Sequence, residues 1–478
     1  MNSLSDKKPV FTYLLTSIPF WVILYFLVRL IGITQPPAEV SHNWRQTTVC
    51  MVARNFQEVD ANILYPRVDM AGEKSGITGM EFPLLNYLIY LLSTVFGYTH
   101  WYGRLINLLV TSIGILFFGK LVKQFTKPRT ALFSVIVLLN SSWLIFGRKI
   151  MPDTFSLSLI IIAVFYGHRY LSTGSFKHLL FYCSLLMAGC LAKLPSIIIL
   201  AFLTPSLLQK PIYSKKKLNL ILLSIVSFVP VIWWYFIWTP YLVKTYEFWH
   251  FFMGVSASEG ISQIIHHLDR VFFHFYFSAL KWIGFALYVY GLLLITIKKD
   301  FRILAIFGAS AILLVLLMSK AGYVFYIHDY YILPFIPVMA LLAGISIERL
   351  KKKTLQISLI ILLMADGIGN QIHDWRIKDS YKYKLELEAY ADRISPTNAL
   401  IAINSGDNPS DMYFAHRKGW MVKSDFYDSQ KSIDSLIAMG CKHFFLTREI
   451  DRDFAGLNNL EEVLTEKDVR IYSLREVD

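Results

Sequence analysis

The chain has 478 residues, of which 55% are hydrophobic and only 17% charged, against about 25% charged in an ordinary soluble domain. The apolar residues form repeated runs of bilayer-spanning length, which excludes a soluble globular protein and predicts a polytopic α-helical membrane protein. The net charge of +13 comes from short Lys and Arg clusters between those runs. Such clusters follow the positive-inside rule, so nucleic-acid binding is not expected.

The N-terminus is predicted to be cytoplasmic, because Lys7 and Lys8 precede the first apolar run at about 11–33. That run has the length of a span and no small-residue cleavage pattern after it, so it is read as a span and not as a cleaved signal peptide. The four cysteines show no CxxC spacing. The sequence therefore predicts neither a zinc site nor a redox pair.

The segment at 34–102 is predicted to be a large extracytoplasmic loop that carries the chemistry. It contains charged and aromatic residues that a plain connector does not need: Trp44, Arg45, Arg54, Asp60, Tyr65, Arg67, Asp69, Glu73, Glu81 and Phe82. Loops longer than about 15 residues are usually functional or disordered. Helical apolar spacing at 49–56 argues against disorder. The apolar stretch 84–96 is short for a span, so we expect it along the membrane surface or only partly inside.

Ten further spans bring the predicted total to roughly eleven. They cover about 105–121, 130–146, 155–170, 178–192, 197–208, 218–238, 282–297, 303–318, 330–347 and 355–368, with a second extracytoplasmic loop at 239–281. This arrangement puts almost every basic cluster on the cytoplasmic side. The basic residues left outside are candidate anion ligands. The alternative is that they only extend from span ends toward water.

Residues 371–478 are predicted to form a soluble extracytoplasmic domain after a transmembrane domain at 1–370. Strand patterns at 399–404, 419–424, 442–447 and 469–474 alternate with helical patterns at 409–418, 429–440 and 459–467. Alternation of this kind predicts a small α/β domain with a parallel sheet. Neither GxGxxG nor GxxxxGK[ST] occurs, so nothing indicates a nucleotide site.

Seven motifs occur in series along the chain: HNWRQTTVCMVARNF (42–56), YPRVD (65–69), GMEFPLLNYL (79–88), GRKIMPD (147–153), LAKLPS (191–196), HDYYILPFIPVMALLAG (328–344) and YFAHRKGW (413–420). In this order they resemble the GT-C class of integral-membrane glycosyltransferases. The resemblance is to the protein-O-mannosyltransferase and aminoarabinose-transferase family and its bacterial ArnT-like members, and it covers nearly the whole chain.

The resemblance implies an inverting glycosyltransferase at the outer face of the bacterial inner (plasma) membrane. The enzyme would move a sugar from a polyprenyl-phosphate-linked donor to a lipid, glycan or protein acceptor. Many members place an acid soon after span one, where this chain has Ser41-His42-Asn43. The base role is then expected to pass to Asp69 or Glu81, or this branch differs. The structural alternative is that these two acids cap a helix or pair with Arg67 or Arg45.

Transfer from a sugar phosphate also needs cations that neutralise the departing phosphate. Lys193 is the favoured donor-phosphate ligand, with Arg148, His328 and Arg270 as weaker candidates. His42, Arg45, Arg67 and Tyr330 are assigned to loop support or substrate contacts, and Asp153 is expected to be a helix N-cap. The alternative for His328 and Tyr330 is a place in the interfacial aromatic belt.

No cofactor is predicted, and a divalent metal is left open. His266 and His267 are adjacent, and on a helix they would point about 100° apart, so a metal site there is not expected. A transporter or flippase for lipid-linked saccharides should show repeated halves, and no internal repeat is found. A polymerase or ligase that joins lipid-linked glycans stays an alternative.

Overall fold

The computed structural model describes residues 15–211, 214–248 and 254–474 and divides into two compact units. The first, called here the helical unit, comprises Met1–Ile33, Arg104–Trp234 and Phe252–Ile372. The second, called the loop-and-sheet unit, comprises Thr34–Gly103, Tyr235–Phe251 and His373–Asp478.

The helical unit consists of apolar helices and short helical segments. These are α2 (Ile18–Arg29), α5 (Trp101–Val122, which starts in the other unit), α6 (Pro128–Asn140), α7 (Trp143–Phe146), α8 (Pro152–Thr173), α9 (Phe176–Ala192), η1 (Leu194–Leu203), α10 (Thr204–Leu208), α11 (Lys215–Trp233), α13 (Ala257–His266), α14 (Leu268–Phe273), η3 (His274–Ala279), α15 (Lys281–Ile297), α16 (Phe301–Ala321), α17 (Tyr323–Ile327), η4 (Asp329–Phe335), α18 (Ile336–Arg349) and α19 (Lys353–Gly369). The predicted helical membrane protein is confirmed.

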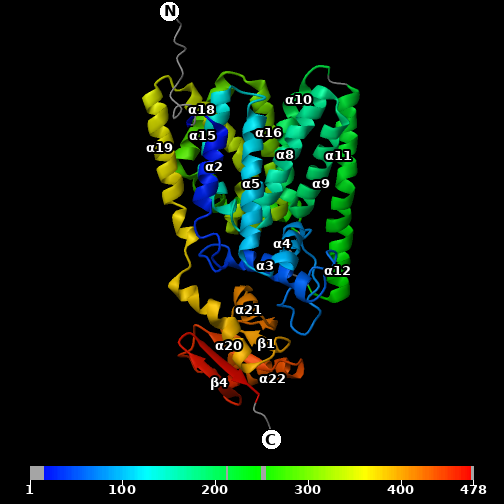
Figure 1. Ribbon diagram of the computed structural model, residues 1–478, viewed down its shortest axis with the longest axis vertical. Coiled ribbons are helices and arrows are strands. Elements are labelled where there is room, and N and C mark those ends of the chain that lie inside the picture. Colours follow the sequence, from blue (N-terminus) through cyan, green and yellow to red (C-terminus); the bar gives the residue numbers. More distant parts are fainter. Residues whose placement is uncertain (1–14, 212–213, 249–253, 475–478) are drawn as a thin grey trace, which may run out of the picture. The chain divides into compact units, whose positions relative to one another are not determined.

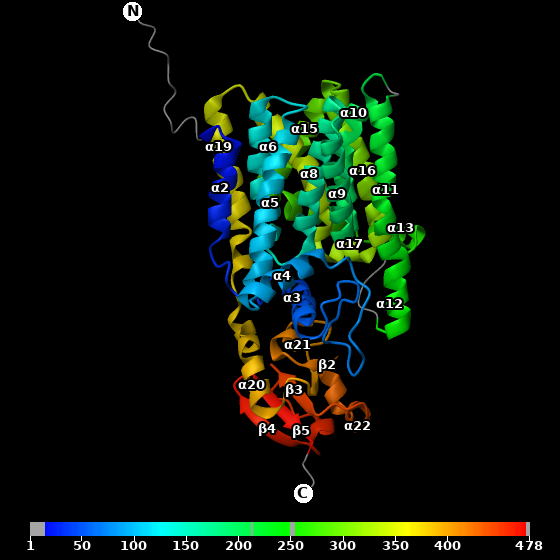
Figure 2. The same cartoon turned by 45° about the vertical axis from the view of Figure 1, so that its right-hand side comes forward.

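Small residues let the helices of this unit approach closely. Helices α8 and α9 run side by side (Figures 1 and 2), and a Cβ added at Gly189 of α9 would lie only 2.5 Å from Cγ1 of Ile160 on α8. A Cβ added at Gly344 of α18 would overlap Ser134 of α6. In lipid, helices associate through such close packing because no hydrophobic effect drives them together.

The predicted count of roughly eleven spans is not confirmed. Among the described residues, five helices are long and apolar enough to cross a membrane, or up to seven if each of two bent pairs forms one span. Several predicted spans are shorter or interrupted: the one at 130–146 breaks between α6 and α7, and the one at 178–192 lies in the 17-residue helix α9. The span predicted at 330–347 is present, because η4 and α18 together form the helix Asp329–Arg349. The described residues of the predicted second loop at 239–281 are largely helical, and positions 249–253 of this loop lie outside the described residues.

The loop-and-sheet unit holds the remaining helices. They are α3 (Asn43–Glu58), α4 (Leu84–Phe96), η2 (Trp234–Trp238), α12 (Thr239–Tyr246), η5 (Ile372–Trp375), η6 (Asp379–Glu386), α20 (Leu387–Ile394), α21 (Ser410–Ala415), η7 (Ser424–Asp428), α22 (Gln430–Ala438) and η8 (Ala455–Leu457). The helix predicted from the apolar spacing at 49–56 is therefore confirmed as α3. The side chain of Asn86 on α4 donates to the carbonyl of Val49 at 3.0 Å and joins the two helices.

A five-stranded mixed sheet in the order β2-β1-β3-β5-β4 organises the C-terminal part of this unit. The strands are β1 (Leu400–Ile403), β2 (Lys418–Met421), β3 (His443–Thr447), β4 (Glu461–Glu466) and β5 (Val469–Ser473). Strands β2, β1 and β3 are parallel, as predicted, whereas β5 pairs antiparallel with both β3 and β4. The small α/β domain is confirmed, and the all-parallel sheet is wrong.

The helix predicted at 459–467 is wrong, because these residues contain β4. Only Lys467 and Asp468 separate β4 from β5, so the two strands form a tight hairpin. Leu and Glu favour helices locally. Pairing with β5 overrides that preference, since the edge strand gains ladder hydrogen bonds.

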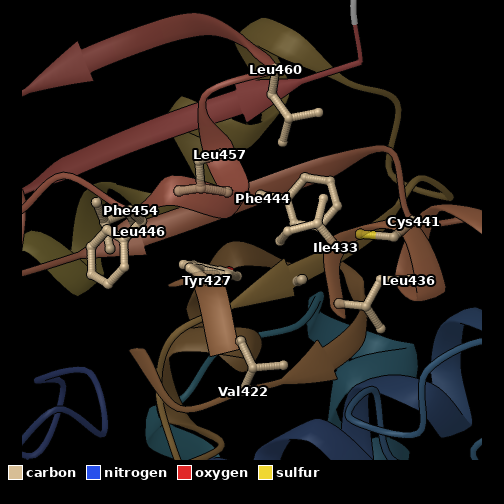
Figure 3. Packing of buried hydrophobic residues seen from close by; sticks show 11 residues of the cluster. Val422, Tyr427, Ile433, Leu436, Cys441, Phe444, Leu446, Phe454, Leu457 and Leu460 are labelled. Atoms are coloured by element: carbon tan, nitrogen blue, oxygen red, sulfur yellow. The ribbon is translucent and has the colours of Figure 1, made fainter. Parts of the chain in front are cut away.

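Apolar side chains fill the space between the sheet and its covering segments. Figure 3 shows Phe444 and Leu446 of β3 pointing toward Ile433 of α22 and Tyr427 of η7. Buried hydrophobic residues of this size each contribute about 1.5–3 kcal/mol relative to exposure. The sheet is therefore a rigid base for the loop residues that attach to its edge.

Candidate functional site

Helix α3 carries polar side chains that are nonetheless buried. Arg45 and Arg54 are 6% and 5% exposed, and Gln46 is fully buried. Burying such groups costs free energy unless they find partners. Their partners are carboxylates of the same unit, which gather at the two ends of α3.

Two carboxylates lie at the N-terminal end of α3. Glu81, which is 2% exposed, forms an ion pair with Arg45. Pairing with this arginine was the alternative to a catalytic role that the sequence analysis offered. Glu39, also 2% exposed, accepts a hydrogen bond on Oε2 from the Gln46 amide at 3.1 Å. The backbone oxygen of Glu39 accepts from the Asn43 side chain at 3.2 Å. Glu39 was not among the residues predicted from the sequence, although it is an acid that follows the first predicted span closely.

His42 directly precedes α3 and adopts the left-handed conformation, with φ at +60°. Its carbonyl accepts the first hydrogen bonds of the helix from the amides of Arg45 and Gln46, at 3.2 and 3.1 Å. Residues other than glycine rarely adopt this conformation, and where they do they cluster at functional sites. His42 thereby fixes the direction in which the chain enters α3.

Asp69 lies at the C-terminal end of α3 and has both carboxylate oxygens engaged. Its Oδ2 accepts from Arg54 at 2.9 Å and its Oδ1 from Asn55 at 2.7 Å. The amide of Gly419 on β2 donates to the Asp69 carbonyl at 2.9 Å. Asp69 thus attaches the loop to α3 and to the edge of the sheet. Arg67, the partner considered for it from the sequence, pairs with Asp60 at 2.9 Å instead.

The C-terminal end of α3 is also joined to α20 and α21 through His416. The imidazole Nδ1 lies 2.6 Å from Glu388 of α20, and Nε2 lies 3.0 Å from Glu58 of α3. These hydrogen bonds, first with Glu388 and then with Glu58, raise the pKa of His416 to about 9. His416 lies in the segment YFAHRKGW and was not predicted to have a site role.

We expect this junction to weaken as the pH rises. Because the pKa of His416 is raised from 6.5 to about 9 by folding, its stabilisation is complete below pH 6.5 and is lost as the pH rises through about 9. We expect the protonated His416 to contribute about 1–2 kcal/mol to the free energy of unfolding, a small value because both acids are partly exposed to solvent. Thermal unfolding of the full chain at pH 6 and pH 10 should show a large midpoint difference between wild type and His416→Asn only at pH 6. Asn tolerates the left-handed backbone at this position, so an equal difference at both pH values would contradict the assignment.

In the helical unit, Lys193 lies at the end of α9 beside Asp153 of α8. The two charges are 3.8 Å apart, and their side chains are 11% and 6% exposed. The Lys193 ammonium also lies 5.7 Å from the centre of the Tyr330 ring, a cation–π contact. Asp153 stands in the first turn of α8, whose N-cap is Met151, so the N-cap expected there is wrong. Its pairing with Lys193 was not foreseen.

The other predicted phosphate ligands have different surroundings. Arg148 is 1% exposed and donates to the carbonyls of Ile31 and Gly32 at 2.7 and 2.9 Å, so it satisfies backbone groups after α2. The ring of His328 stacks on Tyr330 at 5.1 Å. Arg270 is 72% exposed and lies 3.8 Å from Asp269. Within the ranges that the structure describes, no three His, Cys, Asp or Glu side chains gather as a metal site.

Comparisons with known proteins agree with this architecture. Residues 81–234 match the family model described as dolichyl-phosphate-mannose-protein mannosyltransferase. The crystal structure of ArnT from Cupriavidus metallidurans bound to undecaprenyl phosphate is similar with a TM-score of 0.63 at 10% identity, over 96% of this chain and 98% of that chain. By fold the chain is similar to ArnT, and its residues 81–234 match a mannosyltransferase family model. The resemblance predicted from the seven motifs is confirmed.

A second solved structure shares the fold more distantly. The oligosaccharyltransferase AglB from Archaeoglobus fulgidus, in complex with an inhibitory peptide and a dolichol-phosphate, is similar with a TM-score of 0.51 at 10% identity. The match covers 91% of this chain and 70% of AglB. Comparison with curated proteins finds no match. The chain is therefore an integral membrane protein whose similarity to these solved structures lies in its fold and not in close sequence identity.

Proposed function

We propose that this ArnT-like chain is an inverting glycosyltransferase that uses a polyprenyl-phosphate-linked sugar. The observation that carries the proposal is the fold shared over 96% of the chain with an ArnT structure that is bound to undecaprenyl phosphate. The acceptor is a lipid, a glycan or a protein. The polymerase or ligase and the flippase gain no support from the residues described above.

We assign the general base to Glu39. A base takes the proton of the acceptor hydroxyl as the hydroxyl oxygen attacks the anomeric carbon, and the bond from that carbon to the phosphate oxygen breaks with its electrons. Asp69 is a poorer base, because hydrogen bonds from Arg54 and Asn55 occupy both of its oxygens. Glu81 is engaged in a buried ion pair with Arg45. Both acids then position α3, together with Arg45 and Arg67.

Lys193 is the ligand that we propose for the donor phosphate. Its ammonium is a compact point charge suited to phosphate, and Asp153 and Tyr330 hold it at the end of α9. A phosphate that displaces Asp153 from Lys193 would interact with the whole positive charge of the ammonium group. Because the Lys193 side chain is only 11% exposed, little water would screen that interaction. Arg148 and Arg270 are less suited, since the first serves backbone carbonyls and the second is solvated. We propose His328, whose ring stacks on that of Tyr330, as a second contact to the donor phosphate.

The proposed topology follows from the charge pattern. The N-terminus is cytoplasmic, and the loop at 34–102 and the domain at 371–478 face outward from a bacterial inner membrane. Cysteine labelling from outside tests this topology, with Asn459→Cys as the reporter. Asn459 lies in the C-terminal domain, outside its strands and helices. Labelling in intact cells is expected, and labelling only after lysis would reverse the orientation.

The activity itself is tested with the purified full chain and radiolabelled sugars on polyprenyl phosphate. Incubation with a pool of cell-envelope lipids, glycans and proteins should transfer label to one acceptor class. The product should have the opposite anomeric configuration to the donor, as determined by NMR. Failure to transfer from any donor, combined with failure to bind one, would contradict the proposal.

A further inference from the structure

A cavity of about 700 Å³ opens among the ends of α8, α10 and α16 and the residues after α5. It belongs to the helical unit, and Figure 1 shows α10 at one end of that bundle. The residues that give it chemical character are Gln124, Arg169, Leu208, Gln209, Phe301 and Arg302. The proposed transfer reaction uses none of them.

The charge of this cavity is entirely positive. Arg169 and Arg302 line it, and its lining contains no carboxylate. In the described part of the chain, neither guanidinium forms an ion pair with an acid. The neighbouring cavity of about 310 Å³, which Arg302 also lines, differs because its wall contains the acids Asp300 and Glu348. Glu348 pairs there with Lys127 at 3.0 Å and with Arg349 at 3.9 Å. Two guanidiniums that share one hollow repel each other unless an anion lies between them.

The neutral groups of the cavity fit an anion as well. The amides of Gln124 and Gln209 supply N–H donors without adding negative charge. His168 also lines the cavity, but its Nδ1 lies 2.8 Å from Ser206 and its Nε2 3.0 Å from the carbonyl of Phe202. His168 is therefore part of the wall, and the arginines and amides are the ligands.

The rim of the cavity is apolar and exposed. The side chain of Phe301 is 75% exposed and that of Leu208 is 65% exposed, and both residues line the opening. A free inorganic anion has no apolar group that could contact such a rim, whereas a phospholipid has acyl chains next to its headgroup. Basic pockets between transmembrane helices bind anionic headgroups in this way.

We propose that this cavity binds an anionic phospholipid. Arg169 and Arg302 hold the phosphodiester, the two glutamines donate to its oxygens, and the acyl chains lie along Leu208 and Phe301. The site is independent of the proposed transfer reaction, since it shares no residue with the assignments made for Glu39 and Lys193.

The test measures lipid binding by the full chain in detergent by native mass spectrometry. The probes are phosphatidylglycerol, phosphatidylcholine and inorganic phosphate. Wild type is expected to prefer phosphatidylglycerol over phosphatidylcholine. The double variant Arg169→Gln and Arg302→Gln is expected to bind phosphatidylglycerol about tenfold or more weakly. Both side chains are exposed, so the fold should persist, and the elution volume of the variant checks that it does.

The matched control is the double variant Arg129→Gln and Lys215→Gln. It removes the same charge from exposed residues outside both cavities and should keep wild-type lipid binding. Phe301→Ser should weaken phosphatidylglycerol binding and leave inorganic phosphate unaffected. Equal loss in the two double variants would show a general charge effect and overturn the site. Inorganic phosphate binding as tightly as the lipid would overturn the assignment to a phospholipid.

Discussion

Replacing Glu39 with glutamine is expected to lower the turnover of glycosyl transfer by about 100-fold or more, the lower limit for loss of a general base. Glutamine keeps the size of the side chain and its hydrogen bond with Gln46 but cannot accept the proton of the acceptor. Affinity for the lipid-linked donor should stay within about twofold, because Glu39 is assigned to the acceptor. The measurement combines initial rates of transfer with donor binding for Glu39→Gln and wild type.

The acids proposed from the sequence are the internal controls. Asp69→Asn should destabilise the loop but have a smaller effect on the rate of transfer. The variant leaves the Arg54 guanidinium buried beside a neutral amide. Glu81→Gln should do the same through Arg45. A 100-fold loss of turnover in one of these variants alone, with donor binding and unfolding midpoint unchanged, would move the base to that residue. Near-normal turnover of Glu39→Gln would refute its assignment.

Replacing Lys193 with methionine is expected to lower kcat by about 100- to 1,000-fold and to weaken donor binding as well. The loss in kcat is the size found when one donor to a developing charge is removed. Methionine retains the apolar stem beside Tyr330 but leaves Asp153 without its cation, which adds a negative charge next to the leaving phosphate. Transfer rates and binding of polyprenyl phosphate to each variant provide the measurement.

Two variants separate charge from structure at this position. Lys193→Arg keeps the charge and should recover part of the activity, although a guanidinium is larger than an ammonium. Arg270→Gln removes a predicted outside cation that is 72% exposed and should change kcat less than about twofold, because a solvated charge is screened. Equal effects of Lys193→Met and Arg270→Gln would show that neither residue contacts the phosphate.

Properties that depend on local composition were predictable from the sequence. The apolar runs indicated a helical membrane protein, and the positions of most helices were close to those observed, including α4 at Leu84–Phe96. The spacing of apolar residues identified α3. Local composition is sufficient for such features because burial in lipid or in a core selects the same residue types wherever the helix lies.

Features that depend on hydrogen-bond partners were less predictable. The helix expected at 459–467 is the strand β4, because a hairpin with β5 supplies hydrogen bonds that local propensity does not reflect. The span expected at 130–146 is divided after Asn140. The side-chain amide of Asn140 donates a hydrogen bond to the carbonyl of Ile136 at 2.8 Å. Apolar content indicates that a segment is buried and leaves open whether one helix continues through it.

For the site, the sequence by itself determined which residue types were present, and the tertiary structure alone decided their partners. The loop was recognised by its acids and arginines, and pairing of Glu81 with Arg45 was one of the alternatives, but the Arg54–Asp69 pair and Glu39 were not predicted. Lys193 was selected from the sequence, whereas its neighbour Asp153 was taken for a helix cap. An ion pair forms between any opposite charges that the fold brings within about 4 Å. Arg45 and Glu81 are 36 positions apart in the sequence, and Asp153 and Lys193 are 40 positions apart. Each pair meets only because the chain turns back, so tertiary packing and not spacing along the chain sets the distance between the two charges.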